Sequence, residues 1–176
     1  MNQKGLLNPD DMEGKVTNVA GYRFVDLPDR DALREPFRAI CKKAGLKGTI
    51  LLSFEGINFF LAGSQSSVDQ YLDFLEQDSR FSQIHLKYSH TEFQPFNRMN
   101  VRLKKEIISL GLEHVKPAER TGEVITPTEF KRWLDEGREV AIIDTRNDYE
   151  IRLGTFENAL NLNLKSFRAF PKAIES

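Results

Sequence analysis

Two strand-like runs joined by a very short connection constrain the fold of this chain most. Residues 49–54 and 57–62 are mostly apolar, and only Glu55-Gly56 separates them. A two-residue connection with glycine second is typical of a β-hairpin, because glycine tolerates the positive φ that such turns require. The sequence therefore predicts an antiparallel pair of strands here.

The segments around this pair complete a recognisable order. Residues 16–25 and 84–88 alternate like strands. Two helices are indicated by apolar residues at helical spacing, with Ser64 or Ser66 as N-cap of the second and Gly45 as the end of the first. The apolar positions are Leu33, Phe37, Ile40 and Ala44 in the first helix, and Val68, Tyr71, Leu72 and Leu75 in the second. Because proline disfavours a helix interior, the first regular turn is expected close to Pro36.

The predicted order is strand, helix, strand, strand, helix, strand. This is the ferredoxin-like βαββαβ arrangement, in which two helices cover one face of a small sheet. Its expected extent is residues 15–110, after a flexible N-terminus at residues 1–14. A polar connection with proline and glycine follows at residues 111–125, and a second unit is expected at residues 126–176.

The second unit begins with a helix and a buried strand. Thr126 is a predicted N-cap, with Glu129 placed for a capping box, and Gly137 ends the helix. Residues 140–143 are apolar, as in a strand of a parallel sheet that is buried on both faces. Asp144 and Arg146 follow this strand, where the sites of α/β sheets gather. A structural ion pair and a functional site are both open for them.

Charge and composition narrow the function classes. The net charge of −1 gives no global attraction to nucleic acid, so any basic surface must be local. The first eleven residues lack the apolar core of a secretory signal, and no window approaches the roughly 18 apolar residues of a membrane span. One cysteine and three scattered histidines give no zinc spacing, and no flavin motif occurs. A cytoplasmic protein without a membrane segment is expected, and the sequence carries no signal for its oligomeric state.

One local stretch is basic. Residues 80–110 contain six Lys or Arg against two acids, a net charge of +4, interleaved with aromatic residues. This suits phosphate contact and base stacking on RNA, although a solvated surface is the plainer alternative. If the run is a strand, Arg102 and Lys104 share one face and Lys105 the other. The RNA-binding candidates are Lys87 on the adjacent strand-like run, Arg98, Arg102, Lys104 and Lys105.

Two groups of motifs resemble one family. The string DTRNDYE, followed by GTF and FRAFP, is similar to the opening of a rhodanese domain. Earlier, GTILLSFEGIN, LAG and PFNRMNVRLKKEIISLG resemble an acylphosphatase-like N-terminal domain. Together, over residues 16–171, they resemble the rhodanese-related tRNA uridine hydroxylases (TrhO). In place of that family's small residues after E-G-I-N, this chain has Phe59 and Phe60.

The resemblance implies hydroxylation of the wobble uridine of tRNA to 5-hydroxyuridine, with molecular oxygen as co-substrate. It also implies that Asp144, Arg146 and Glu150 frame a rhodanese site. In the family the catalytic cysteine lies in a C-T-G-G-I-R-C-like loop, which would fall beyond Ser176, so no catalytic residue is expected within these 176 residues. The alternatives are a rhodanese-type sulfurtransferase and a non-catalytic RNA-binding or regulatory module.

Cys41 is not expected to replace the family cysteine. It lies four residues after Phe37, on the flank of the predicted apolar stripe, with neither a glycine-rich loop nor a histidine nearby. Although Lys42 and Lys43 could lower its pKa, a buried and inert core cysteine is the favoured interpretation. The chain by itself is therefore expected to be inactive.

Overall fold

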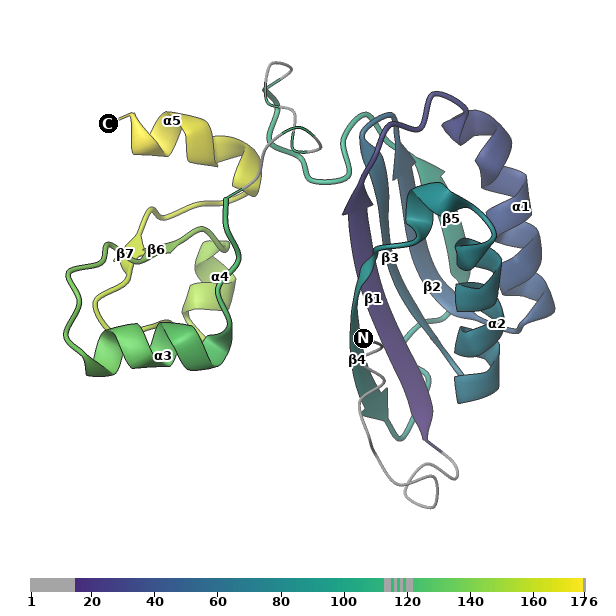
Figure 1. Ribbon diagram of the computed structural model, residues 1–176, viewed down its shortest axis with the longest axis horizontal. Coiled ribbons are helices and arrows are strands. Elements are labelled where there is room, and N and C mark those ends of the chain that lie inside the picture. The colour runs from purple at the N-terminus through teal and green to yellow at the C-terminus, as the bar shows by residue number, and fades with distance from the viewer. Residues whose placement is uncertain (1–14, 113–114, 116, 118, 120–121, 176) are drawn as a thin grey trace. The chain divides into compact units, whose positions relative to one another are not determined.

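The computed structural model describes residues 15–112, 115, 117, 119 and 122–175, and the predicted flexible N-terminus, residues 1–14, lies outside them. The chain divides into an N-terminal unit, Met1–Ile107, and a C-terminal unit, Ile108–Ser176. Each is considered by itself (Figure 1). The elements of the N-terminal unit are β1 (Val16–Phe24), α1 (Arg30–Lys43), β2 (Lys47–Ser53), β3 (Gly56–Gly63), α2 (Gln65–Glu76), η2 (Ser79–Phe81), β4 (His85–Thr91) and β5 (Met99–Leu103).

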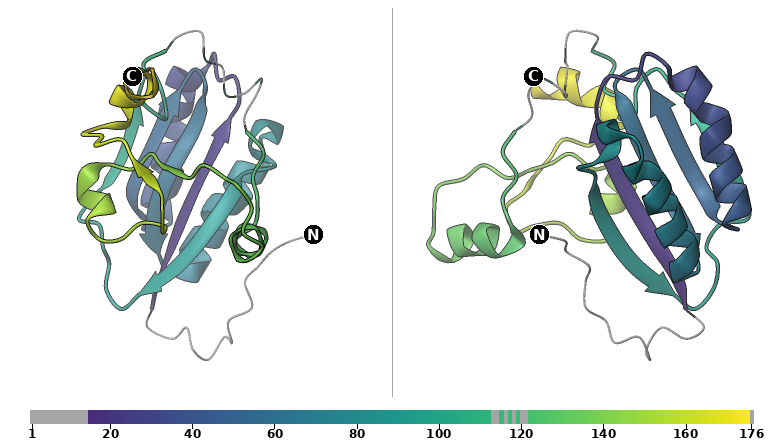
Figure 2. Two further views of the ribbon diagram at one scale, coloured as in Figure 1. Left: turned by 90° about the vertical axis from the view of Figure 1, so that its left-hand side faces the viewer. Right: turned by 45° about the vertical axis from the view of Figure 1, so that its right-hand side comes forward.

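The N-terminal unit is a five-stranded sheet with both long helices on one face (Figure 2). The strand order is β4-β1-β3-β2-β5. All pairs are antiparallel except β2 and β5, which are parallel. The predicted ferredoxin-like βαββαβ order is confirmed, and β5 adds a fifth strand at one edge. The face turned away from α1 and α2 is called the open face below.

The connection between β2 and β3 differs by one residue from the prediction. Ser53 pairs with Gly56, so Phe54 and Glu55 form the loop and Gly56 is the first residue of β3. Gly56 has φ +144°, and a Cβ there would lie 2.0 Å from the carbonyl oxygen of Arg23. Glycine is required here for two reasons: the positive φ, as predicted, and the close passage of β1.

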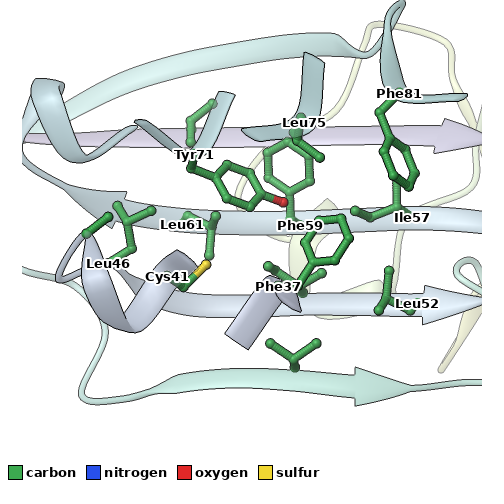
Figure 3. Close-up of a cluster of buried hydrophobic side chains, with 14 of the residues drawn as sticks. Phe37, Cys41, Leu46, Leu52, Ile57, Phe59, Leu61, Tyr71, Leu75 and Phe81 are labelled. Carbon is green, nitrogen blue, oxygen red and sulfur yellow. The ribbon is translucent and has the colours of Figure 1, made fainter. Parts of the chain in front are cut away.

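The core of this unit lies between the sheet and the two helices (Figure 3). Aromatic rings dominate its centre: Phe37 of α1 packs against Phe74 and Phe81, and Phe59 of β3 packs against Tyr71 of α2 with 5.2 Å between centroids. Edge-to-face contacts of this kind add to the gain from burying the rings. Strand alternation puts one apolar residue in two into this core, which fixes the register of the sheet.

Helix α1 begins earlier than predicted. It starts at Arg30, so Pro36 lies inside the helix and not near its first turn. Pro36 is exposed, whereas Phe37 and Cys41 are buried against the sheet. A proline removes one helical hydrogen bond. We infer that packing of the apolar face offsets this loss, which is a tertiary effect that local propensity does not contain.

The C-terminal unit holds shorter elements. Strands β6 and β7 pair in parallel over two residues each, so the predicted parallel pairing is present. The predicted strand over residues 140–143, buried on both faces, is wrong: only Ile143 of that run is in β6, and Val140 and Ile143 are exposed. Burial of a parallel strand needs neighbours on both sides, and among the described residues β6 has a single neighbouring strand, β7. The elements are α3 (Pro127–Asp135), β6 (Ile143–Asp144), α4 (Asp148–Ile151), β7 (Leu160–Asn161), η3 (Phe167–Ala169) and α5 (Phe170–Ile174).

Helix caps in this unit agree only in part with the prediction. The Thr126 hydroxyl accepts from the Glu129 amide at 3.1 Å, as expected, and Gly137 follows the helix at φ +65°. The Glu129 carboxylate, however, accepts from the side chains of Arg132 and Trp133, so the predicted capping box is replaced by contacts within the helix. A complete capping box occurs instead at α4, between Asn147 and Glu150.

Candidate nucleic-acid interface

The topology separates residues that are close in the sequence. Lys87 is in β4 and Arg102 is in β5, and these strands form opposite edges of the sheet. Four strand spacings lie between them, about 19 Å at roughly 4.8 Å each. The two strand-like runs that adjoin in the sequence therefore do not form one compact basic patch.

Both residues nevertheless share the open face. Val101 belongs to the core, so its neighbour Arg102 points to the opposite side of the sheet. Lys87 pairs with Ala20 of β1, and the adjacent pair is Tyr88 with Val19. Val19 points into the core, so Ala20 and Lys87 point to the open face. Lys87 and Arg102 thus lie at the two edges of one surface, and both are exposed.

The remaining candidates lie at the ends of β5. Arg98 precedes the strand, and its carbonyl oxygen accepts from the Gly48 amide at 3.1 Å. The strand ends at Leu103, and the Lys104 amide then donates to the Leu52 carbonyl at 2.8 Å. Arg30 donates to the carbonyl oxygen of Lys104. Lys104 and Lys105 are exposed and lie outside the strand, so alternation does not force them onto opposite faces.

Arg80, which contributes to the basic stretch in the sequence, is engaged within the protein. Its guanidinium lies 2.5 Å from an oxygen of Asp29 and 2.6 Å from an oxygen of Asp78. Hydrogen bonds from Arg80 hold the pKa of both carboxyls below the usual range, and the pKa of Arg80 itself is raised. This cluster joins the start of α1 to η2, so we assign Arg80 a structural role.

Sequence reasoning missed two aromatic residues on the open face. Tyr22 of β1 is 43% exposed and Phe60 of β3 is 47% exposed, although both belong to central strands. The adjacent pair Phe59-Phe60 was the available signal, because alternation must place one of the two rings outside the core. Phe59 is 1% exposed and fills the core.

The residues expected to frame a rhodanese site form a closed local network. Arg146 donates to Asp144 at 2.6 and 3.0 Å and to the Gly154 carbonyl at 2.7 Å, while the Thr155 hydroxyl donates to Asp144 at 2.7 Å. These hydrogen bonds, with that from Arg146 the strongest influence, lower the pKa of Asp144. The ion pair is thus present and ties the end of β6 to the following turn.

Glu150 has a comparable local role. Its carboxylate accepts from the backbone amide of Asn147 at 3.1 Å. Beside this network lies a groove of about 660 Å³. The groove is lined by Phe130, Ile142, Ile143, Asp144, Thr145, Arg146, Gly154, Thr155 and Phe156.

Cys41 is buried in the core of the N-terminal unit, as predicted (Figure 3). Burial raises the pKa of its thiol to about 12. A thiol with such a pKa is almost entirely protonated near neutral pH, and the thiolate is the nucleophilic form. Among the described residues, no group of three or more His, Cys, Asp or Glu is arranged to hold a metal ion. None of the described helices is long and apolar enough to cross a membrane.

Comparison with known proteins supplies the family context. The family model described as UPF0176 acylphosphatase like domain matches residues 16–107. A protein of Cupriavidus necator named tRNA uridine(34) hydroxylase is 47% identical over 165 residues, which cover 91% of this chain and 58% of the relative. A protein of the same name from Thiobacillus denitrificans is 44% identical, covering 91% of this chain and 66% of the relative. This chain thus spans about three fifths of the length of these curated relatives.

Solved structures were also compared. An acylphosphatase from Coxiella burnetii matches with 14% sequence identity and a TM-score of 0.38, covering 51% of this chain and 95% of the acylphosphatase. An acylphosphatase from Bacillus subtilis matches with 11% identity and a TM-score of 0.34, covering 50% of this chain and 97% of that protein.

Proposed function

Because the chain belongs to the family of the UPF0176 acylphosphatase-like domain, we propose that it is the tRNA-holding part of a hydroxylase that acts on the wobble uridine of tRNA. The product would be 5-hydroxyuridine, and molecular oxygen would be the co-substrate. The observation that carries the proposal is the 47% identity to a tRNA uridine(34) hydroxylase, which extends over 91% of this chain. Such a protein would work in the cytoplasm.

The structure supports a division of labour between the two units. The ferredoxin-like sheet carries Arg102 on its open face, with Arg98, Lys104 and Lys105 around the ends of β5. These residues are our candidates for contact with tRNA phosphates. The C-terminal unit, in which Arg146 pairs with Asp144 and Glu150 accepts from Asn147 at the start of α4, would be the first part of a rhodanese domain, beginning near residue 126 after a connection at residues 111–125.

Chemistry on uridine would require a thiolate that the described core does not offer. Cys41 is the one cysteine of the sequence, and its buried thiol has a pKa of about 12. The 176-residue chain alone should therefore form no 5-hydroxyuridine and transfer no sulfur. Mass spectrometry of nucleosides from treated tRNA, together with a thiocyanate assay, measures both activities.

The Cys41→Ala variant is the control for this prediction. It should lower the free energy of unfolding by about 1 kcal/mol, since it removes one buried sulfur atom, and leave both assays unchanged. Turnover by the chain that disappears in the folded variant would show that Cys41 is a nucleophile. It would also favour a catalytic role for the N-terminal unit.

Binding of tRNA tests the proposed interface. Arg102→Glu combined with Lys104→Glu should weaken tRNA binding at least about ten-fold at low salt and reduce the salt dependence, because each neutralised phosphate contributes a counterion-release term. The loss should be similar for different tRNAs, since phosphate contacts position a nucleic acid without reading its sequence. Fluorescence anisotropy over a range of salt concentrations gives both quantities.

A matched control distinguishes loss of the proposed interface from the effect of a lower net charge. Lys42→Glu with Lys43→Glu changes the charge of the chain by the same amount, at the end of α1. This control should bind tRNA almost as well as the unaltered chain. If both double variants lose affinity equally, the residues around β5 have no special role and their charges only solvate the surface.

A further inference from the structure

The open face presents aromatic rings at its centre. Tyr22 is paired with Asn58 across β1 and β3, and Phe60 is paired with Ala20. On their other sides, Tyr22 is paired with His85 of β4 and Phe60 with Thr49 of β2. The two aromatic residues are diagonal neighbours, whose Cα atoms lie about 7–8 Å apart. Two exposed rings therefore lie side by side on the two central strands of the N-terminal unit.

Aromatic neighbours brace both rings from the side. Tyr22 meets Phe24 with centroids 6.0 Å apart at 73°, and Phe60 meets Phe96 with centroids 5.1 Å apart at 81°. These are edge-to-face contacts and not stacked ones. The bracing limits the motion of each ring while about half of its surface stays accessible, so little conformational entropy is lost if a flat ligand stacks on it.

The charge on the sheet has one sign. All five strands lack aspartate and glutamate, and their charged residues are basic. The acids of the unit occur in the helices and connections. On the open face, Lys87 and Arg102 flank the two rings from opposite edges of the sheet. The surface therefore combines flat apolar groups at its centre with cations at its rims.

We propose that this open face is a stacking platform for unpaired RNA bases, with Tyr22 and Phe60 under two neighbouring bases and Lys87 and Arg102 on phosphates at either side. The inference rests on the proposed function, which makes RNA the substrate. Single-stranded RNA is bound in general by such a pairing of aromatic rings with backbone cations. An open sheet face with rings on its central strands is also the surface that RNA-recognition sheets use. The cations alone would suit either RNA or an acidic protein surface. The exposed rings favour RNA, because its bases can stack on them.

Leucine replacements test whether the aromatic rings bind RNA while keeping apolar side chains on the open face. The Tyr22→Leu, Phe60→Leu double variant keeps an apolar side chain at both positions and removes both π-faces. We expect an affinity loss of at least about ten-fold for an unstructured RNA and for tRNA, with an unchanged salt dependence. A 2-aminopurine base within the unstructured RNA should be quenched on binding to the unaltered chain and less so on binding to the variant.

Two further variants serve as controls. Phe156→Leu with Tyr149→Leu removes one exposed phenylalanine and one exposed tyrosine of the C-terminal unit, and should bind as the unaltered chain does. Tyr22→Phe with Phe60→Tyr keeps both rings and should retain affinity and quenching. Far-UV circular dichroism of all variants verifies that the sheet is intact. A duplex RNA of equal length should bind more weakly and be insensitive to the leucine changes.

The possible results separate the two proposals. If the unaltered chain does not bind tRNA at low salt, the proposed function fails and the platform fails with it. If the unaltered chain binds tRNA and the folded leucine variant binds equally well, the platform alone is wrong. Hydrogen exchange that shows the open face already covered before RNA is added, with no change on addition, would assign the face to a protein contact and overturn the platform.

Discussion

Replacing Phe59 with alanine should lower the free energy of unfolding of the N-terminal unit by about 3–5 kcal/mol. The side chain is 1% exposed and packs edge-to-face against Tyr71. It also fills the space over Gly21, where an added Cβ would lie 2.6 Å from the Phe59 ring. Removing the ring leaves a cavity at the meeting point of sheet and helix, which the surrounding strands cannot close. Urea unfolding followed by circular dichroism measures the loss.

The adjacent residue provides an internal control. Phe60→Ala should cost less than about 1 kcal/mol, because the side chain is 47% exposed and its ring contact is with Phe96 at the surface. Its main effect should be on RNA binding. Equal destabilisation by the two substitutions would contradict the placement of these rings on opposite faces of β3.

Gly56→Ala should destabilise the same unit by about 3 kcal/mol or more. Its φ of +144° is unfavourable for a residue with a Cβ, and that Cβ would lie 2.0 Å from the Arg23 carbonyl oxygen. Relieving the clash would push β3 away from β1. The hydrogen bond from the Val25 amide to the Glu55 carbonyl, 3.0 Å in length, lies next to this point and would be strained as well. Thermal and urea unfolding measure the cost.

The Gly45→Ala variant measures the cost of a positive φ without the steric clash that is present at Gly56. Gly45 also has a positive φ, +69°, but no atom lies within 4 Å of an added Cβ. Its substitution should therefore cost only about 1–2 kcal/mol, the usual penalty for the left-handed conformation. If the two alanine variants were equally stable, the close approach of β1 to Gly56 would not contribute to the cost of the Gly56→Ala substitution.

Local sequence patterns were sufficient for the elements that depend on neighbouring residues. The βαββαβ order followed from apolar spacing and turn residues, the Ser64 cap of α2 was among the expected ones, and Cys41 was placed in the core by its distance from Phe37. The expected relationship to tRNA uridine hydroxylases was also confirmed by relatives of that name. Each of these inferences uses information within a few turns of chain or within a motif.

The features that local sequence patterns did not predict depend on the pairing of strands that are far apart in the chain. The sequence correctly identified Gly56 as a position of positive φ, but the close approach of the Arg23 carbonyl depends on β1 lying beside β3, which no local pattern contains. The apolar run at residues 140–143 has the composition of a buried strand, yet burial depends on neighbours, and within the described part of the chain β6 pairs only with β7.

The candidate interface shows the same division most clearly. The sequence by itself determined that Lys87 and Arg102 are basic, that Lys87 lies in an alternating strand-like run, and that Phe59 and Phe60 are adjacent in another. Only the tertiary structure decided that β4 and β5 are the two edges of one sheet, with Tyr22 and Phe60 exposed between them. The physical reason is that alternation is fixed by backbone geometry within each strand, whereas strand order is fixed by which strands pair along their length, a contact between residues far apart in the chain.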